Sequence, residues 1–279
     1  GGRTYIKVSR QASQASEQFR QDGTSGPYSG GLDALGYEDR SAYLYLEHGL
    51  TARTTVVVLV PRKDLLLRTP HPQASSGLPG TDRPIERSAA GLENVYVGVR
   101  RDLNSMFGLA SDGPHSSALN VGVRLPMGYD REASPSVGSG QVDLDVMVYY
   151  GISLWPAPGY AQIGTGLRVR SGIYALSSGD NDSPDYGNEW LIHAEAGVSI
   201  GKWALLQGLF FGTVSNQPPE LSFDPQNPLP TRQRYIKPGV GLTLYPARWL
   251  GLSAQVFSTP WGANTVRSTD WFFGMETRF

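Results

Sequence analysis

The hydrophobic and polar positions of this chain alternate with a period of two residues. In VDLDVMVYYGI at 142–152, the even positions are apolar or tyrosine, whereas the odd positions include Asp143, Asp145 and Gly151. Three further stretches alternate in the same way: 119–125, 190–200 and 236–244. Successive side chains of a β-strand point to opposite faces, so each stretch predicts a strand with one apolar face and one polar face.

Turn-forming residues divide the chain into about twelve such strands. We expect the strands at 2–20, 38–50, 52–65, 90–103, 114–126, 139–154, 158–175, 186–200, 202–216, 231–247, 248–260 and 266–279. The predicted short turns lie at 48–52, 156–159, 201–202 and 245–248, with a somewhat longer one near 101–113. The predicted long loops lie at 21–37, 66–89, 127–138, 176–187 and 216–230. Connections that are short on one side and long on the other are typical of outer-membrane barrels, which have periplasmic turns and extracellular loops.

The last predicted strand has a distinctive ending. Its odd positions Trp271, Phe273, Met275 and Phe279 are apolar, with Thr277 as the one exception, and its even positions are mainly polar. An alternating strand that ends on an aromatic residue resembles the C-terminal signal of bacterial outer-membrane proteins. We therefore expect these four apolar residues to form a membrane-insertion signal for the barrel-assembly machinery.

Composition excludes several classes of protein. The 279 residues include no Cys, which excludes a disulfide scaffold and a Cys-based zinc site, and 24 basic against 25 acidic residues give no electrostatic footprint for nucleic acid. No run of 18 apolar residues exists, so a helical membrane span is excluded. The mean hydropathy of −0.28 is typical of a soluble protein. A membrane barrel gives the same average, because only every second residue of its strands is apolar.

These features predict an all-β fold in which residues 1–279 form one domain. We expect a transmembrane, up-and-down antiparallel β-barrel of about twelve strands, because strands cross lipid only when the sheet closes. The start, Gly1-Gly2-Arg3, has no Met and no apolar segment of signal-peptide length. We therefore expect the mature chain of a protein of the bacterial outer membrane, in contact with its lipid. The alternative is a soluble β-sandwich or lectin-like domain, which hides its apolar faces between two sheets.

Aromatic residues near the predicted strand ends are candidates for the belts that barrels place at the two membrane interfaces. They are Tyr5, Tyr43, Trp155, Trp190, Trp203, Trp249 and Trp261.

Several short motifs are similar to a known family. The runs GLENVYVGVRRDL (91–103), SALNVGVRLPMGYD (117–130) and VGSGQVDLDVMVYYGIS (137–153) resemble the phenol-degradation MetA-pathway family of outer-membrane proteins, as do YLEHGLTARTTVVVLVP (45–61) and GANTVRSTDWFFGMETRF (262–279). Met127 departs from the family's pattern, which has Thr there. The resemblance implies a transporter-like barrel, often placed near pathways for hydrophobic or aromatic compounds, with no established catalytic residues to transfer.

The polar positions of the predicted strands face the interior of a barrel, so they predict a lumen lined by charged residues. If the turn near 155–158 places residues whose numbers sum to about 313 opposite each other, Asp145 faces Arg168 and Asp143 faces Arg170, with Arg124 near Asp143. These charges either form a constriction that selects polar or anionic solutes, or brace the wall as a ladder of ion pairs. Under either interpretation, Arg168→Ala destabilises the barrel or opens it. We expect three inward tyrosines to line the same path: Tyr43, Tyr45 and Tyr149.

A second inward group consists of His193, Glu195 and Gln207, which the turn at 201–202 brings together. His and Glu on one face suggest acid–base chemistry, but no nucleophile motif accompanies them, so a hydrogen-bonded lumen histidine is the preferred interpretation. We expect no enzyme activity, no cofactor and no metal. The loops DGTSG, SSGDNDSPD and FDPQNP offer oxygen ligands for calcium, yet such acidic loops are more often simply solvated.

The sequence thus predicts a passive channel for small molecules, with hydrophobic or aromatic compounds as the candidate solutes. Two alternatives remain open at this stage. One is a non-conducting barrel that anchors a partner protein through its extracellular loops 66–89 and 216–230, and the other is a barrel hydrolase. About twelve strands enclose at most a narrow pore, because side chains already fill an eight-stranded barrel.

Overall fold

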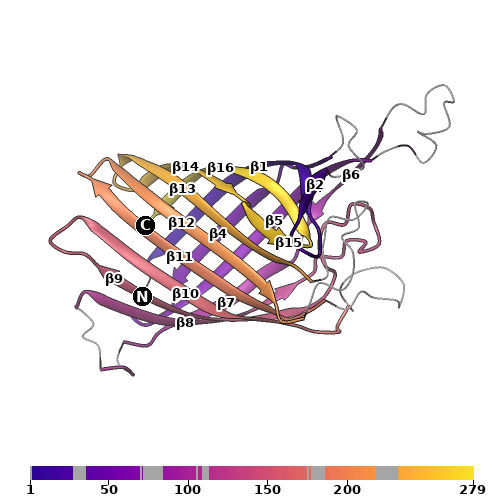
Figure 1. Cartoon of the computed structure of the whole chain (residues 1–279). Helices are drawn as coiled ribbons and strands as arrows, with labels where there is room; N and C mark the ends of the chain where they lie inside the picture. The colour runs from indigo at the N-terminus through magenta and orange to yellow at the C-terminus, as the bar shows by residue number, and fades with distance from the viewer. Residues whose placement is uncertain are drawn as a thin grey trace.

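The fold is a closed antiparallel β-barrel. The computed structural model describes residues 2–27, 36–69, 71, 84–104, 106–108, 113–174, 176, 186–217 and 232–279. Within these ranges every regular element is a strand, and the strands pair around a complete circle that closes between β12 and β13 (Figure 1). None of the described residues belongs to a helix that is long and apolar enough to cross a membrane.

Twelve strands form the wall of the barrel. In chain order they are β1 (Thr4–Phe19), β4 (Ala42–Gly49), β5 (Thr54–Thr69), β7 (Val95–Asp102), β8 (His115–Leu125), β9 (Asp143–Ser153), β10 (Gly159–Arg170), β11 (Glu189–Ile200), β12 (Ala204–Ser215), β13 (Arg234–Ala247), β14 (Leu250–Ser258) and β16 (Thr265–Arg278). Each of them overlaps one predicted strand, so the predicted fold class is confirmed. Four short strands extend this wall: β2 (Ser25–Pro27), β3 (Gly36–Asp39), β6 (Ile85–Leu92) and β15 (Trp261–Ala263).

The largest difference from the predicted boundaries concerns the loops 21–37 and 66–89. β3 continues β4 in the same register, since β1 pairs Arg10 with Ala42 and Ser13 with Asp39. β6 pairs with Arg62–Thr69 of β5 and carries this hairpin beyond the rim of the barrel (Figure 1). Both extensions lack a continuous apolar face, so alternation did not reveal them. Most of the predicted loops 176–187 and 216–230 lies outside the described residues.

The two faces of the wall have the predicted parity. On β16 the outward Trp271, Phe273 and Met275 are 49%, 56% and 54% exposed, while the inward Asp270 and Glu276 are 2% and 7% exposed. In a membrane barrel the exposed face contacts acyl chains, so the apolar band is exposed to lipid rather than to water. Both chain ends lie at the end of the barrel that carries the short turns (Figure 1).

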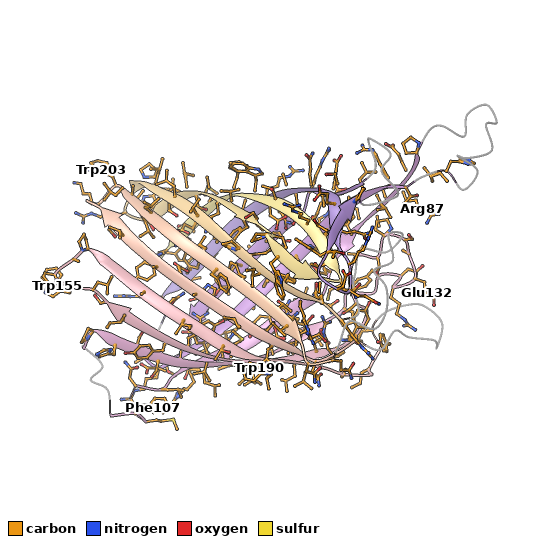
Figure 2. All side chains as sticks on the ribbon, viewed as in Figure 1. Arg87, Phe107, Glu132, Trp155, Trp190 and Trp203 are labelled. Carbon is orange, nitrogen blue, oxygen red and sulfur yellow. The ribbon has the colours of Figure 1, made fainter. Side chains whose placement is uncertain are left out.

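The five tryptophans predicted for the interfacial belts are all exposed, by 47–82%, and their level in a membrane stays a prediction. Trp155 and Trp203 project from the turn end and Trp190 from the outer wall, whereas Arg87 and Glu132 mark the loop end (Figure 2). The prediction is wrong for Tyr5 and Tyr43. Their hydroxyls donate to Glu276 and Gln11 in the lumen, at 2.8 and 2.5 Å, because both residues lie at inward positions of their strands.

Inward tyrosines lie flat over glycines of their own strand or of a neighbouring strand. Tyr96 on β7 covers Gly98 and Gly122, where a Cβ at Gly122 would lie 2.5 Å from the ring. Asn120 donates to the Tyr96 hydroxyl at 2.8 Å, and the Arg124 guanidinium lies 5.4 Å from the ring centroid. The glycines at inward positions therefore leave room for the tyrosine rings to lie against the wall. The rings are thereby kept out of the centre of the lumen.

Replacing Gly122 by valine is expected to push the Tyr96 ring into the lumen. The displaced ring loses its hydrogen bond from Asn120, so the free energy of unfolding should fall by roughly 1–3 kcal/mol. Urea unfolding of the barrel refolded into lipid vesicles measures this loss. Gly208→Val is the matched control, because no atom lies within 4 Å of a Cβ built at Gly208. Equal losses for the two variants would contradict the packing argument.

Candidate functional site in the barrel lumen

An ion-pair network lines one side of the lumen near the loop end. β9 and β10 pair Asp145 with Arg168 and Asp143 with Arg170, the register expected from the turn between them. Arg168 Nε lies 2.9 Å from Asp145 Oδ1, and Arg170 Nη1 lies 3.1 Å from Asp143 Oδ2. The structure thus brings together four of the sequence-predicted lumen residues.

Two features of this network differ from the sequence interpretation. Arg124 lies opposite Asp143 in the register, but its guanidinium binds Asp145 at 2.8 Å, because the side chain leans along the strand. The sequence analysis also missed Glu189, which is 2% exposed and receives Arg168 at 2.9 Å and Arg170 at 3.1 Å. The alternation could have found it, because the inward residues of β11 have odd numbers and Glu189 is the first of them.

The network is electrically balanced and lies against the wall. Three arginines face three carboxylates, and the carboxylates of Asp143, Asp145 and Glu189 are 2–6% exposed. Buried charges of this kind satisfy one another, so little field remains to attract a solute in the lumen. The geometry favours the bracing interpretation over a selective charged constriction.

The second predicted group also forms. Gln207 Nε2 donates to Glu195 Oε1 at 2.7 Å, and His193 Nε2 lies 3.9 Å from Glu195 Oε2. Tyr160, which the sequence analysis did not single out here, donates its hydroxyl to the same carboxylate. Glu195 therefore accepts from neighbouring wall residues, as a structural carboxylate does. Among the described residues, no group of three or more His, Asp and Glu side chains has an arrangement that would hold a metal ion.

Aromatic side chains form a continuous belt around much of the lumen. Each ring is in contact range of the next, with centroid distances between 4.9 and 6.2 Å. In order around the wall the belt consists of Tyr43 (β4), Phe272 (β16), Phe257 (β14), Phe211 (β12), His193 (β11) and Tyr149 (β9). Of these, the sequence analysis singled out Tyr43, Tyr149 and His193. It missed the three phenylalanines.

Phe211 is the member of the belt that projects furthest into free space. It lies at an inward position, opposite His193 on β11 and Lys237 on β13. Nevertheless, 40% of its surface is exposed, which is unusual for an inward phenylalanine of a narrow barrel. The lumen therefore contains open space beside an apolar ring.

A connecting segment folds onto the inner wall at the loop end. Residues 135–141, within the predicted loop and at its junction with β9, are all buried. Asn94 of the β6–β7 junction, 4% exposed, donates to the Gln141 carbonyl at 3.0 Å and accepts from the Tyr129 hydroxyl. Gln141 in turn donates to Asp143 at 2.8 Å. We call residues 126–142 the inner loop, and its contacts connect it directly to the ion-pair network.

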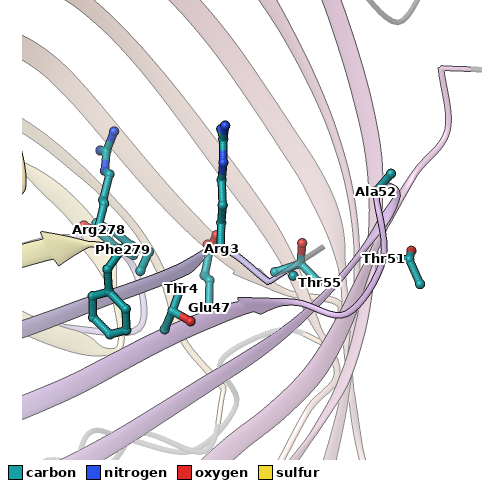
Figure 3. Close-up of a pocket in the computed structure, with 10 residues that line it drawn as sticks. Arg3, Thr4, Glu47, Thr51, Ala52, Thr55, Arg278 and Phe279 are labelled. Atoms are coloured by element: carbon teal, nitrogen blue, oxygen red, sulfur yellow. The ribbon is translucent and has the colours of Figure 1, made fainter.

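The opposite end of the lumen opens into a recess of about 550 Å³. Its lining includes Arg3, Glu47 and Thr55 near the first turn, and Arg278 and Phe279 at the last strand (Figure 3). The turn end of the lumen therefore has open space beside the first and last strands.

The fold is similar to those of solved outer-membrane channels. A channel from Pseudomonas putida F1, described as the COG4313 outer membrane channel, superimposes on 100% of this chain and 96% of its own length, with a TM-score of 0.72 at 14% sequence identity. The NanC porin matches 98% of both chains with a TM-score of 0.56, and the KdgM porin matches 98% of this chain and 99% of its own with 0.53, both at 6% identity. No protein-family model and no curated protein matches the chain. The chain has the barrel fold of outer-membrane channels, the fold that its resemblance to the phenol-degradation MetA-pathway family implied.

Proposed function

We propose that this barrel is a passive conduit for small apolar molecules, aromatic ones in particular, across the outer membrane. The aromatic belt carries this proposal. Phe211 presents an exposed ring to the lumen, Phe257 is buried against it, and the half-buried Phe272 continues the row of rings around the wall. Aromatic solutes stack on such rings with modest energy, so they enter and also leave. The barrel needs no cofactor and no catalytic group for this role.

Two further parts of the chain fit the same role. The recess at the turn end provides a wide mouth on the side where both termini lie. The apolar odd positions Trp271, Phe273, Met275 and Phe279 are all exposed on the outer face, where we propose that they serve as the insertion signal read by the barrel-assembly machinery.

Substituting Phe211 by alanine tests the proposal. Uptake of the hydrophobic aromatic dye 1-N-phenylnaphthylamine by cells with an intact outer membrane should fall about fivefold, which corresponds to roughly 1 kcal/mol of lost ring contact. Because the side chain also fills space, liposome swelling with arabinose should become faster. Phe210→Ala is the matched control, since Phe210 is the outward neighbour on the same strand. Unchanged dye uptake by Phe211→Ala, or an equal loss with Phe210→Ala, would refute a path along the belt.

The inner loop favours a second candidate, a non-conducting barrel that serves as an anchor. Its residues 135–141 are buried at the loop end, where a segment packed inside the barrel would obstruct the path. Planar-bilayer recording separates the two candidates. Steady open-channel current in the wild-type protein supports the conduit, whereas complete absence of current and of dye uptake supports the anchor.

A further inference from the structure

The outer face of the barrel carries arginines where most strands carry apolar residues. Counted from the turn end, β1 presents Ile6 and Val8 outward and then Arg10, and β5 presents Val56, Val58 and Val60 and then Arg62. Both arginines are exposed. On β9 the outward series stays apolar or aromatic through Val148, Val146 and Leu144. The lipid-facing band is thus interrupted locally, on β1 and β5.

Arg10 and Arg62 lie side by side with one small residue between them. Ala42 on β4 is the register partner of Arg10 on one side and of Arg62 on the other. Strands in a sheet are about 4.8 Å apart, so the two Cα atoms are roughly 10 Å apart across a methyl group. Two extended arginine side chains can therefore reach one ligand placed above Ala42.

Neither arginine has an ion-pair partner among the described residues, in contrast to their neighbours. Arg40, on the same face, binds Glu38 at 2.7 Å, and Glu38 also binds Arg68 at 2.5 Å. Asp64 is exposed one outward position beyond Arg62, but forms no ion pair with Arg62 in the described part of the chain. An arginine that faces lipid without a counter-charge is costly unless an anion from its surroundings meets it.

A hollow lies on the loop side of Arg10 and begins one outward position beyond it on β1, at Ala12, although its lining includes neither Arg10 nor Arg62. It measures about 280 Å³ and is lined by Ala12 and Gln14 of β1, Glu38 and Arg40, and Thr269 and Trp271 of β16. The Trp271 ring stacks on Phe273, with centroids 6.5 Å apart, and Phe273 is the register partner of Arg10. Outward tryptophans mark the level of lipid headgroups. Trp271 is the register partner of Ala12, so Arg10 lies one outward position below the level of Trp271, and its extended side chain can reach a headgroup in the hollow.

We propose that Arg10 and Arg62 bind the phosphate of a phosphorylated glycolipid of the outer leaflet, with the headgroup seated in the hollow beside Trp271. Guanidinium groups match phosphate oxygens in bidentate geometry, and this pair has no competing carboxylate in contact. The acyl chains would then lie along Val8, Leu44 and Val60, the apolar row directly below. This site is on the outer face and is independent of the lumen path.

Native mass spectrometry of the detergent-solubilised protein tests the proposal, with bisphosphorylated lipid A as the probe. The wild type should retain the lipid, and the double variant Arg10→Gln/Arg62→Gln should bind it at least roughly tenfold more weakly, because each arginine contributes about fivefold near an anionic lipid surface. Lipid A with both phosphates removed should bind the wild type as weakly as the double variant binds the intact lipid. A large excess of inorganic phosphate should not displace the lipid.

Arg101→Gln is the control, because Arg101 is an outward arginine at the turn end that donates to Thr54 at 2.6 Å. It should leave lipid A binding unchanged. Retention of the folded form without boiling on gels shows that each variant is a closed barrel. Equal binding by the folded double variant, equal binding of the dephosphorylated lipid, displacement by inorganic phosphate, or an equal loss with Arg101→Gln would each overturn the proposal.

Discussion

Replacing Arg168 by alanine should lower the free energy of unfolding by about 3 kcal/mol. Arg168 contacts both Asp145 and Glu189 at 2.9 Å, and the side chains of these two residues are 6% and 2% exposed. Without the guanidinium, two buried negative charges face each other with less compensation, and breaking a buried pair costs about 3–5 kcal/mol. The lower end of that range applies, because the Arg168 side chain itself remains 18% exposed. Urea unfolding in lipid vesicles measures the loss.

Two further variants show whether charge compensation is the cause. Arg267→Ala removes an ion pair to Glu17 whose partners are 48% and 45% exposed, and such pairs contribute about 0–1 kcal/mol. The double change Arg168→Met/Glu189→Gln removes one charge of each sign, leaves Asp145 paired with Arg124 and Asp143 paired with Arg170, and should recover much of the stability. If Arg168→Ala leaves stability unchanged but alters ion selectivity, the network is a constriction and the bracing interpretation is wrong.

The alternation of apolar and polar residues was sufficient to predict the wall of the barrel. On β9 and β10 it also gave the pairing of Asp143 with Arg170, because a short turn fixes the register of an antiparallel hairpin. It did not predict which charges meet. Arg124 turns from its register partner Asp143 to Asp145, since long side chains reach diagonal neighbours as easily as opposite ones.

The aromatic belt was visible only in part because its members come from strands far apart in sequence. Tyr43 and Phe272 contact each other across β1, and Phe257 and Phe211 across β13. Alternation assigns each of these residues to a face, but the tilt of the strands decides which of them share a level. That tilt is a property of the closed barrel and is not contained in any one segment.

The motifs GSGQ and PMGYD, on which the family resemblance rested, have a physical role that their sequence did not reveal. They are the two ends of the inner loop and bind each other, since Gly140 donates its N–H to the Tyr129 hydroxyl at 2.8 Å. A Cβ at Gly138 would collide with the Tyr129 ring. A long polar loop is expected to be solvated on the surface. Part of this one is buried because its backbone groups find partners, the Gln141 carbonyl at Asn94 and the Gly140 N–H and Gly138 carbonyl within the loop itself.

Replacing Asn94 by alanine should release the inner loop and raise single-channel conductance severalfold. Asn94 holds the loop at Gln141, whose carbonyl it contacts at 3.0 Å, and at the Tyr129 hydroxyl. Loss of a buried hydrogen-bonding side chain costs about 1–3 kcal/mol, and this cost falls on the closed position of the loop rather than on the strands. Planar-bilayer recording should therefore show a larger mean current and new transitions between levels.

The control for this prediction is Asn120→Ala. Asn120 is also buried in the lumen and binds Tyr96, but it has no hydrogen bond to the inner loop among the described residues. Its loss should destabilise the barrel to a similar degree without new conductance levels. If Asn94→Ala and Asn120→Ala give the same current as the wild type, the loop end of the lumen is closed by something other than the inner loop. An increase confined to Asn94→Ala instead shows that the inner loop limits the path.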